Sequence, residues 1–206
     1  MYKEFFSASA IALTFMAFIP YIRSIRQGTT KPHVFSWIIW GSTTFVVFLA
    51  QLADQAGSGA WPIGVSGMIT MYIAALAYQQ KADVAISRLD WWFFITALTA
   101  LPTWYFTADP LWAVIILTIV DVLGFGPTFS KAYAQPHGEQ LKFYIIVVIR
   151  NLLAIMALQH YSITTVLFPA ALAMACVVFI LMVMYRRKAS IAARQAAAKP
   201  VSTGSG

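Results

Sequence analysis

The sequence predicts an all-α protein whose helices cross a membrane seven times. Its 206 residues are 60% hydrophobic and 10% charged, whereas a soluble domain carries about 25% charged residues. The apolar residues fall in blocks of 16 to 23, and a helix needs about 20 residues to cross a bilayer. Basic residues recur in every second connection between blocks. These observations exclude an ordinary soluble domain and predict a polytopic membrane protein.

Seven apolar blocks define the expected spans. The first continues past the small residues 7–10 without a convincing cleavage site, so we expect a retained helix rather than a signal peptide. The fourth is the shortest and contains Pro102. Divided at Pro, Gly and charged residues, the predicted spans are 5–22, 34–52, 61–78, 91–106, 111–129, 141–158 and 163–185.

Lys and Arg residues set the expected orientation. The second, fourth and sixth connections contain neither, whereas the first, third and fifth connections and the segment after the last span are basic. Positive residues favour the cytoplasmic side, so the N-terminus is predicted outside and the C-terminus inside, in a bacterial inner membrane. Because the net charge of +7 gathers at span ends, the bilayer rather than nucleic acid is the expected partner. Residues 189–206 are small, polar and basic, and we expect a disordered tail.

A proline pattern repeats along the chain. Pro20 and Pro127 are 107 residues apart, and so are Pro62 and Pro169. Spans one to three and five to seven also run in the same directions. We therefore predict two parallel three-helix bundles, residues 1–80 and 108–188, joined by an inversion linker helix within 81–107. Prolines also collect at helix ends by default, which is the alternative explanation. Such repeats are typical of transporters, whose site lies near the membrane midplane between the halves.

The layout and one local stretch resemble a known family. Residues 20–41, "PYIRSIRQGTTKPHVFSWIIWG", place a proline before basic residues, a Thr-rich loop and a helix that begins with Ser and Trp. This stretch, with the three-plus-one-plus-three layout, resembles the SWEET and PQ-loop superfamily, which includes the SemiSWEETs. Tyr21 and Thr128 stand where that superfamily has glutamine after proline. The resemblance implies the fold and a transport function for small molecules.

Pro20 and Pro127 are candidate hinges. Each lacks a backbone N–H and leaves the carbonyl one turn earlier without its helix bond. The resemblance to SWEETs implies that such kinks form an inner gate. The equal alternative is that the two prolines simply end their helices.

Two opposite charges fall inside neighbouring predicted spans. Asp121 lies about 15 Å along its span and Arg150 about 13 Å along the next, at 1.5 Å per residue. Either charge costs about 2.5–3.5 kcal/mol at a helix centre, so we expect both to face the interior and to form a pair. The repeat aligns Asp121 with Thr14 and Arg150 with Thr43. The charges therefore belong to a clamp in the second half or to a site between the halves.

Further polar and aromatic residues are candidates for the lining of a substrate site. Asn151 follows Arg150, and Trp40, Thr43 and Thr44 lie on the second span. Aromatic rings with a few hydroxyl and amide groups are typical of a small-molecule pocket. Tyr72 on the third span is a further candidate.

The sequence favours a small-molecule transporter over other membrane proteins. It contains no HExxH motif, no glutamate within a span and no lysine inside the seventh span, so neither an intramembrane enzyme nor a retinal protein is expected. No metal or cofactor is expected. The substrate is predicted to be a sugar or another small polar metabolite, and a homo-oligomer stays open. The alternatives are a non-transporting receptor or assembly protein on the same fold, or a PnuC-type vitamin transporter.

Overall fold

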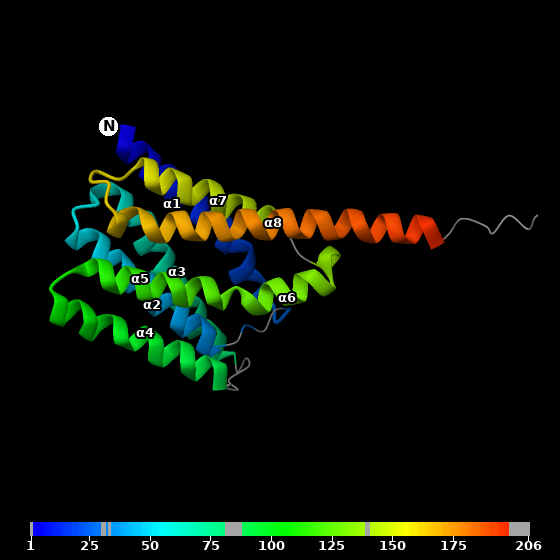
Figure 1. Cartoon of the computed structure of the whole chain (residues 1–206), viewed down its shortest axis with the longest axis horizontal. Coiled ribbons are helices and arrows are strands. Elements are labelled where there is room, and N and C mark those ends of the chain that lie inside the picture. Colours follow the sequence, from blue (N-terminus) through cyan, green and yellow to red (C-terminus); the bar gives the residue numbers. More distant parts are fainter. Residues whose placement is uncertain (1, 30–31, 33, 81–87, 139–140, 198–206) are drawn as a thin grey trace, which may run out of the picture.

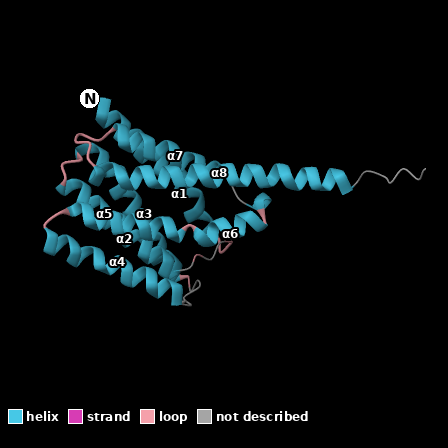
Figure 2. Ribbon diagram, viewed as in Figure 1, coloured by secondary structure: helices cyan, strands magenta, loops and turns pink. Residues whose placement is uncertain are grey.

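The computed structural model describes residues 2–29, 32, 34–80, 88–138 and 141–197, and this part of the chain contains helices and connections without a strand (Figure 2). The helices are α1 (Tyr2–Arg26), α2 (Val34–Ala53), η1 (Gly57–Ala60), α3 (Trp61–Gln79), α4 (Arg88–Thr107), α5 (Pro110–Gly124), α6 (Gly126–Ala134), η2 (Pro136–Gly138), α7 (Leu141–Met156) and α8 (Ile163–Ala197).

Four helical segments within the described residues are long and apolar enough to cross a membrane. They are Tyr2–Arg26, Val34–Ala53, Gly57–Gln79 and Ile163–Ser190, and the apolar helix Pro110–Gly124 is shorter. Large apolar side chains are exposed on the outside of the bundle, for example Tyr105 and Phe106 at 82% and Met174 at 63%. Among the described residues, thirteen Ser, Thr, Gln, Asp, Asn and Arg side chains are buried instead. A soluble protein shows the reverse distribution, so these features are those of a membrane-embedded protein.

The helices form two packed groups. Helix α3 packs against α1 and α2, and α8 packs against α5 and α7. The groups meet where α1 contacts α7 and where α2 contacts α5, while α4 lies against α5. The start of α1 and the α2–η1, α4–α5 and α7–α8 connections lie at one end of the bundle, here called the Tyr2 end (Figure 1). The opposite end is called the Arg26 end, and α8 projects beyond it (Figure 1).

The two aligned prolines have different local structures. Pro20 lies inside α1, which continues to Arg26, so it does not end that helix. Pro127 is the second residue of α6, and α5 has already ended at Gly124. The predicted span 111–129 is therefore divided. The missing N–H of Pro127 removes a bond to the carbonyl one turn earlier, and the N–H of Phe125 closes the end of α5 on the Val122 carbonyl at 3.1 Å.

The last helix corrects the expectation of a disordered tail from residue 189. Helix α8 continues to Ala197, and residues 198–206 lie outside the described part. The segment "KASIAARQAA" is rich in Ala, Arg, Lys and Gln, which are strong helix formers. Extending an existing helix also avoids the cost of nucleation. A basic, polar composition was thus not sufficient to predict disorder here.

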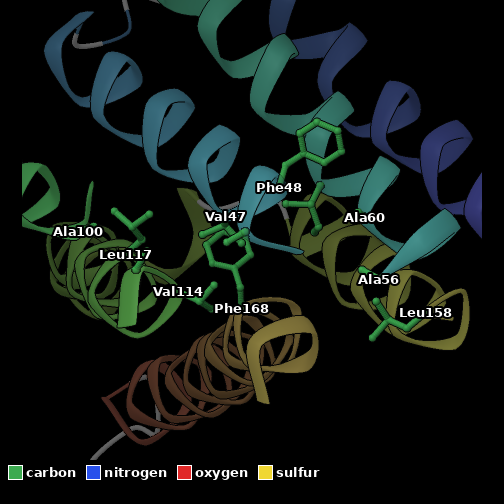
Figure 3. Close-up of a cluster of buried hydrophobic side chains, with 12 residues drawn as sticks. Val47, Phe48, Ala56, Ala60, Ala100, Val114, Leu117, Leu158 and Phe168 are labelled. Atoms are coloured by element: carbon green, nitrogen blue, oxygen red, sulfur yellow. The ribbon is translucent and has the colours of Figure 1, made fainter. Parts of the chain in front are cut away.

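An apolar cluster joins the two groups toward the Tyr2 end. It contains Val47 and Phe48 from α2, Leu117 from α5 and Phe168 from α8, together with Leu158 in the α7–α8 connection (Figure 3). Phe168 and Leu158 are fully buried. Because α2 and α5 run in opposite directions, residues one turn away from Val47 and Leu117 toward the Arg26 end come together. These residues are polar.

Candidate functional site: a buried polar layer

A layer of polar side chains lies inside the bundle, one turn from the apolar cluster. Every member is at most 8% exposed. The two charged members, Asp121 and Arg150, are 5% and 4% exposed. The layer consists of Thr14 on α1, Thr43 and Thr44 on α2, Thr118 and Asp121 on α5, and Arg150 and Asn151 on α7.

The Asp121 carboxyl group is bound by the first helical group. Thr43 Oγ1 lies 2.7 Å from Asp121 Oδ1 and 3.0 Å from the carbonyl oxygen of Trp40. A threonine hydroxyl has one proton and can also accept. If Asp121 is ionised, the hydroxyl donates to it. If Asp121 is protonated, it donates to Thr43, which donates in turn to Trp40. The same heavy-atom positions therefore accommodate both protonation states.

The guanidinium group of Arg150 has few partners. Its Nη2 donates to Asn151 Oδ1 at 2.9 Å, and its buried Nε has no hydrogen-bond partner among the described residues. Asn151 Nδ2 donates to the Val147 carbonyl at 2.9 Å, which holds the amide in place. The Cys176 thiol on α8 is near enough to interact electrostatically with Arg150.

The predicted ion pair between Asp121 and Arg150 is not formed. Among the described residues, the salt bridge within 4.0 Å is that of His160 with Asp54, far from this layer in the α2–η1 and α7–α8 connections. The prediction placed α5 and α7 side by side because they are neighbours in the chain. In the structure α8 packs against both of them, and Asp121 turns instead to Thr43 on α2.

Aromatic rings cover the layer on the side of the Arg26 end. The half-buried Trp40 lies against Gly124, where an added Cβ would be 2.8 Å from its Nε1. Trp37 meets Trp40 edge to face at 5.8 Å, and Tyr21 stacks on Trp37 at 5.0 Å. The close approach of α2 to the end of α5 thus requires a glycine.

Tyr72 lies apart from the other predicted site residues. Its side chain is 43% exposed, and its hydroxyl accepts a hydrogen bond from Arg26 Nη2 at 2.5 Å. It therefore links α3 to the end of α1 on the surface. The other predicted residues, Trp40, Thr43, Thr44, Asp121, Arg150 and Asn151, lie on α2, α5 and α7, where those helices face the interior.

The sequence analysis did not single out three buried residues, of which Thr118 belongs to the layer. Thr118 lies one turn before Asp121, and its buried Oγ1 has no partner among the described residues. Gln51 lies two turns after Thr43 and donates from Nε2 to the Thr165 carbonyl at 2.8 Å, while its Oε1 has no partner. Cys176 is 1% exposed. A spacing of three residues from Asp121 would have indicated Thr118, and spacings of seven and eight residues from Thr44 and Thr43 would have indicated Gln51.

Polar contacts close the Tyr2 end. The N–H of Gln159 donates to the Ala56 carbonyl at 2.9 Å, and Ser58 Oγ donates to the Ala157 carbonyl at 2.9 Å. Lys3 Nζ donates to the Leu158 carbonyl at 2.7 Å. These bonds join the α2–η1 segment and the start of α1 to the α7–α8 connection.

A second set of contacts closes the same end beside the first. Ser162 Oγ donates to Asp54 Oδ2. His160 Nδ1 lies 3.1 Å from the Asp54 carbonyl oxygen and 3.8 Å from Asp54 Oδ2. The closure therefore joins connections that belong to different helical groups.

Two hollows on this structure are lined by residues outside the polar layer. One of about 380 Å³ is lined by Leu101, Trp104, Tyr105 and Ala108 at the end of α4. Another of about 150 Å³ lies between α7 and α8 and is lined by apolar side chains only. Within the described residues, no three His, Cys, Asp or Glu side chains gather as metal ligands would. The polar layer is thus enclosed by protein.

Comparison with known proteins returns no relative: no family model, no curated protein and no solved structure matches this chain.

Proposed function

We propose that this protein is a small-molecule membrane transporter that works by alternating access between two three-helix units. In this proposal the chain spans the membrane seven times, with the N-terminus outside and the C-terminus inside. Helices α1, α2 and α3 form the first unit, and α5 with α6, α7 and α8 form the second. Helix α4 is the linker that lets both units have the same orientation.

The observation that carries the proposal is the reciprocal packing of the two helical groups. A shift of 107 residues brings α1 (Tyr2–Arg26) onto α5 and α6 together (110–134), and α2 (Val34–Ala53) onto α7 (Leu141–Met156). It brings Gly57–Gln79 onto the membrane-length part of α8. Under this shift the α1–α7 contact becomes the α5–α2 contact, and both contacts are present. Such exchange is what a twofold axis between repeats produces, and it supports a duplicated transporter architecture.

The position of the polar layer also supports transport. Buried ionisable residues inside membrane helices are costly and mark substrate or ion pathways. Asp121 bonds to Thr43 across the contact between the two groups, which supports a site between the repeats. The closed Tyr2 end corresponds to the outside in the proposed orientation, so opening it and closing the Arg26 end would give the alternate state.

Uptake into proteoliposomes tests this function. Labelled sugars, amino acids and organic acids are offered to the wild type and to a variant with Ser58→Cys and Ala157→Cys in a Cys176→Ala background. The bond from Ser58 to the Ala157 carbonyl places these positions side by side. We expect saturable uptake that oxidation of the new pair blocks and reduction restores.

Two outcomes would contradict the proposal. Equal uptake by the oxidised and reduced pair, with the crosslink verified, would exclude alternating access through the Tyr2 end. Absence of uptake by the wild type across the whole panel would favour a receptor or assembly protein on this fold.

A further inference from the structure

Arg150 carries a buried positive charge without a counterion among the described residues. A guanidinium group has five N–H donors. One bond goes from Nη2 to Asn151, and the buried Nε has no partner. The other charge of the layer, Asp121, is engaged with Thr43. The charge of Arg150 is therefore uncompensated in this conformation.

An uncompensated charge at this depth is expensive. Arg150 is the tenth residue of α7, which places it about 13 Å from the start of the helix. A buried charge that has lost its partner strongly destabilises a folded protein. Asn151 does not neutralise the charge, because its amide is neutral and is itself held by the Val147 carbonyl. Asn151 instead orients the guanidinium group and leaves its remaining donors available.

We propose that Arg150 binds the carboxylate of a small monocarboxylate substrate. This inference rests on the proposed transport function and names the class of substrate. The planar fork of an arginine matches the two oxygens of a carboxylate. One guanidinium group balances one negative charge, whereas a phosphate ester carries about 1.5 to 2 at neutral pH. The excess charge of a phosphate would be buried without a second cation to balance it among the described residues.

The sole cysteine provides a reporter beside the proposed subsite. Cys176 lies on α8, which packs against α7, the helix that carries Arg150, and the chain has no other cysteine. Its thiol is 1% exposed, so a small maleimide reaches it when the bundle opens. The purified wild type in nanodiscs is alkylated with acetate, lactate or benzoate present, and in parallel with acetamide, lactamide or benzamide. We expect a carboxylate at ten times its Kd to slow alkylation about tenfold, and we expect the neutral amides to leave the rate unchanged.

Variants decide whether Arg150 is responsible. Arg150→Gln is expected to abolish protection by the carboxylate, and Arg150→Lys to keep part of it because the charge stays while the fork is lost. Arg26→Gln is the control, because it changes a surface arginine that is bound to Tyr72. In this variant the carboxylate should protect Cys176 as well as it does in the wild type. Asn151→Ala retains the charge of Arg150 but removes the amide that orients its guanidinium group. We expect the Kd of the carboxylate to rise about tenfold in this variant. Elution as a single species checks that each variant is folded.

Four results would overturn the inference. The first three are equal protection in the wild type and in Arg150→Gln, equal protection by carboxylates and amides, and no protection by any carboxylate of the panel. The fourth is protection of Cys176 by a carboxylate in Asp121→Asn but not in the wild type. Asp121 would then be the counterion of Arg150 in another conformation, and a substrate carboxylate would not be needed. Uptake of a neutral solute without carboxylate protection refutes this subsite and leaves transport standing. Protection without uptake refutes transport and leaves the subsite.

Discussion

Thr43 on α2 and Asp121 on α5 share a 2.7 Å hydrogen bond that joins the two helical groups inside the bundle. The 107-residue shift maps this pair onto Arg150 and Thr14 at the α1–α7 contact. There the described structure has no such bond: Thr14 donates to the Ala10 carbonyl of its own helix, and Arg150 bonds to Asn151. The two contacts have related helix packing and different chemistry, with an acid at one and a base at the other.

Removing the Thr43 hydroxyl should destabilise the contact between the groups. Thr43→Val keeps the shape of the side chain and leaves a buried Asp121 without its donor, which typically costs about 1–3 kcal/mol. Thermal unfolding in detergent measures this loss. Thr99→Val is the matched control, because Thr99 is exposed and its hydroxyl donates to the Thr96 carbonyl of its own helix. An equal decrease in Tm for both variants would contradict a stabilising role for the Thr43–Asp121 bond.

Adding a methyl group at the end of α5 should force α2 and α5 apart. At Gly124 an added Cβ would be 2.8 Å from Trp40 Nε1. Overpacking of this kind costs about 1–3 kcal/mol, so Gly124→Ala should lower the Tm and change the tryptophan fluorescence. Gly126→Ala is the control, since nothing lies within 4 Å of its added Cβ. Identical spectra and Tm values for the two alanine variants would show that the close packing of Trp40 on Gly124 is not required.

A change at the Tyr2 end should open the closure there. A Cβ on Gly59 would lie 2.6 Å from the backbone nitrogen of Leu158, and a backbone atom cannot rotate away as a side chain can. We expect Gly59→Ala to weaken this closure and to increase the alkylation rate of Cys176 several-fold. Ser9→Ala, which removes an exposed bond to Phe5 within α1, should leave the rate unchanged. A rate in Gly59→Ala no higher than in the wild type would show that the Tyr2 end does not control access to Cys176.

The orientation is testable with reporter fusions in a bacterial host. Alkaline phosphatase fused after Asp109, in the α4–α5 connection, should be active because this connection is proposed to lie outside. Green fluorescent protein fused after Gly206 should fluoresce because the C-terminus is proposed to lie inside. An inactive phosphatase at Asp109, or a C-terminal fusion without fluorescence in well-expressed protein, would require a different topology.

Much of the helical organisation could be predicted from the chain alone. The predicted span 34–52 corresponds to α2 (Val34–Ala53), and 61–78 corresponds to α3 (Trp61–Gln79). Apolar length and Pro or Gly at the ends define these helices locally. The division of the fifth block after Gly124 was not predicted. The aligned prolines gave no sign of it, because the same residue type at Pro20 stays inside a continuous helix. A proline by itself therefore does not decide between a kink and a break.

The partners of the charged side chains were harder to predict. Arg150 and Asp121 were rightly expected to be buried, since lipid excludes charge. Their pairing was wrong, because it assumed that helices adjacent in sequence are adjacent in space. Helix α8 packs against both α5 and α7, and Thr43, far from Asp121 in sequence, becomes its partner.

The sequence by itself determined that the chain is helical and apolar outside. It also identified the residues that must avoid lipid. Both properties follow from composition and periodicity along single helices. Only the tertiary structure decided which helices meet. That choice depends on side-chain packing between distant segments, such as Trp40 on Gly124. This packing leaves Asp121 bound to Thr43, and it leaves Arg150 with an N–H donor that has no partner among the described residues.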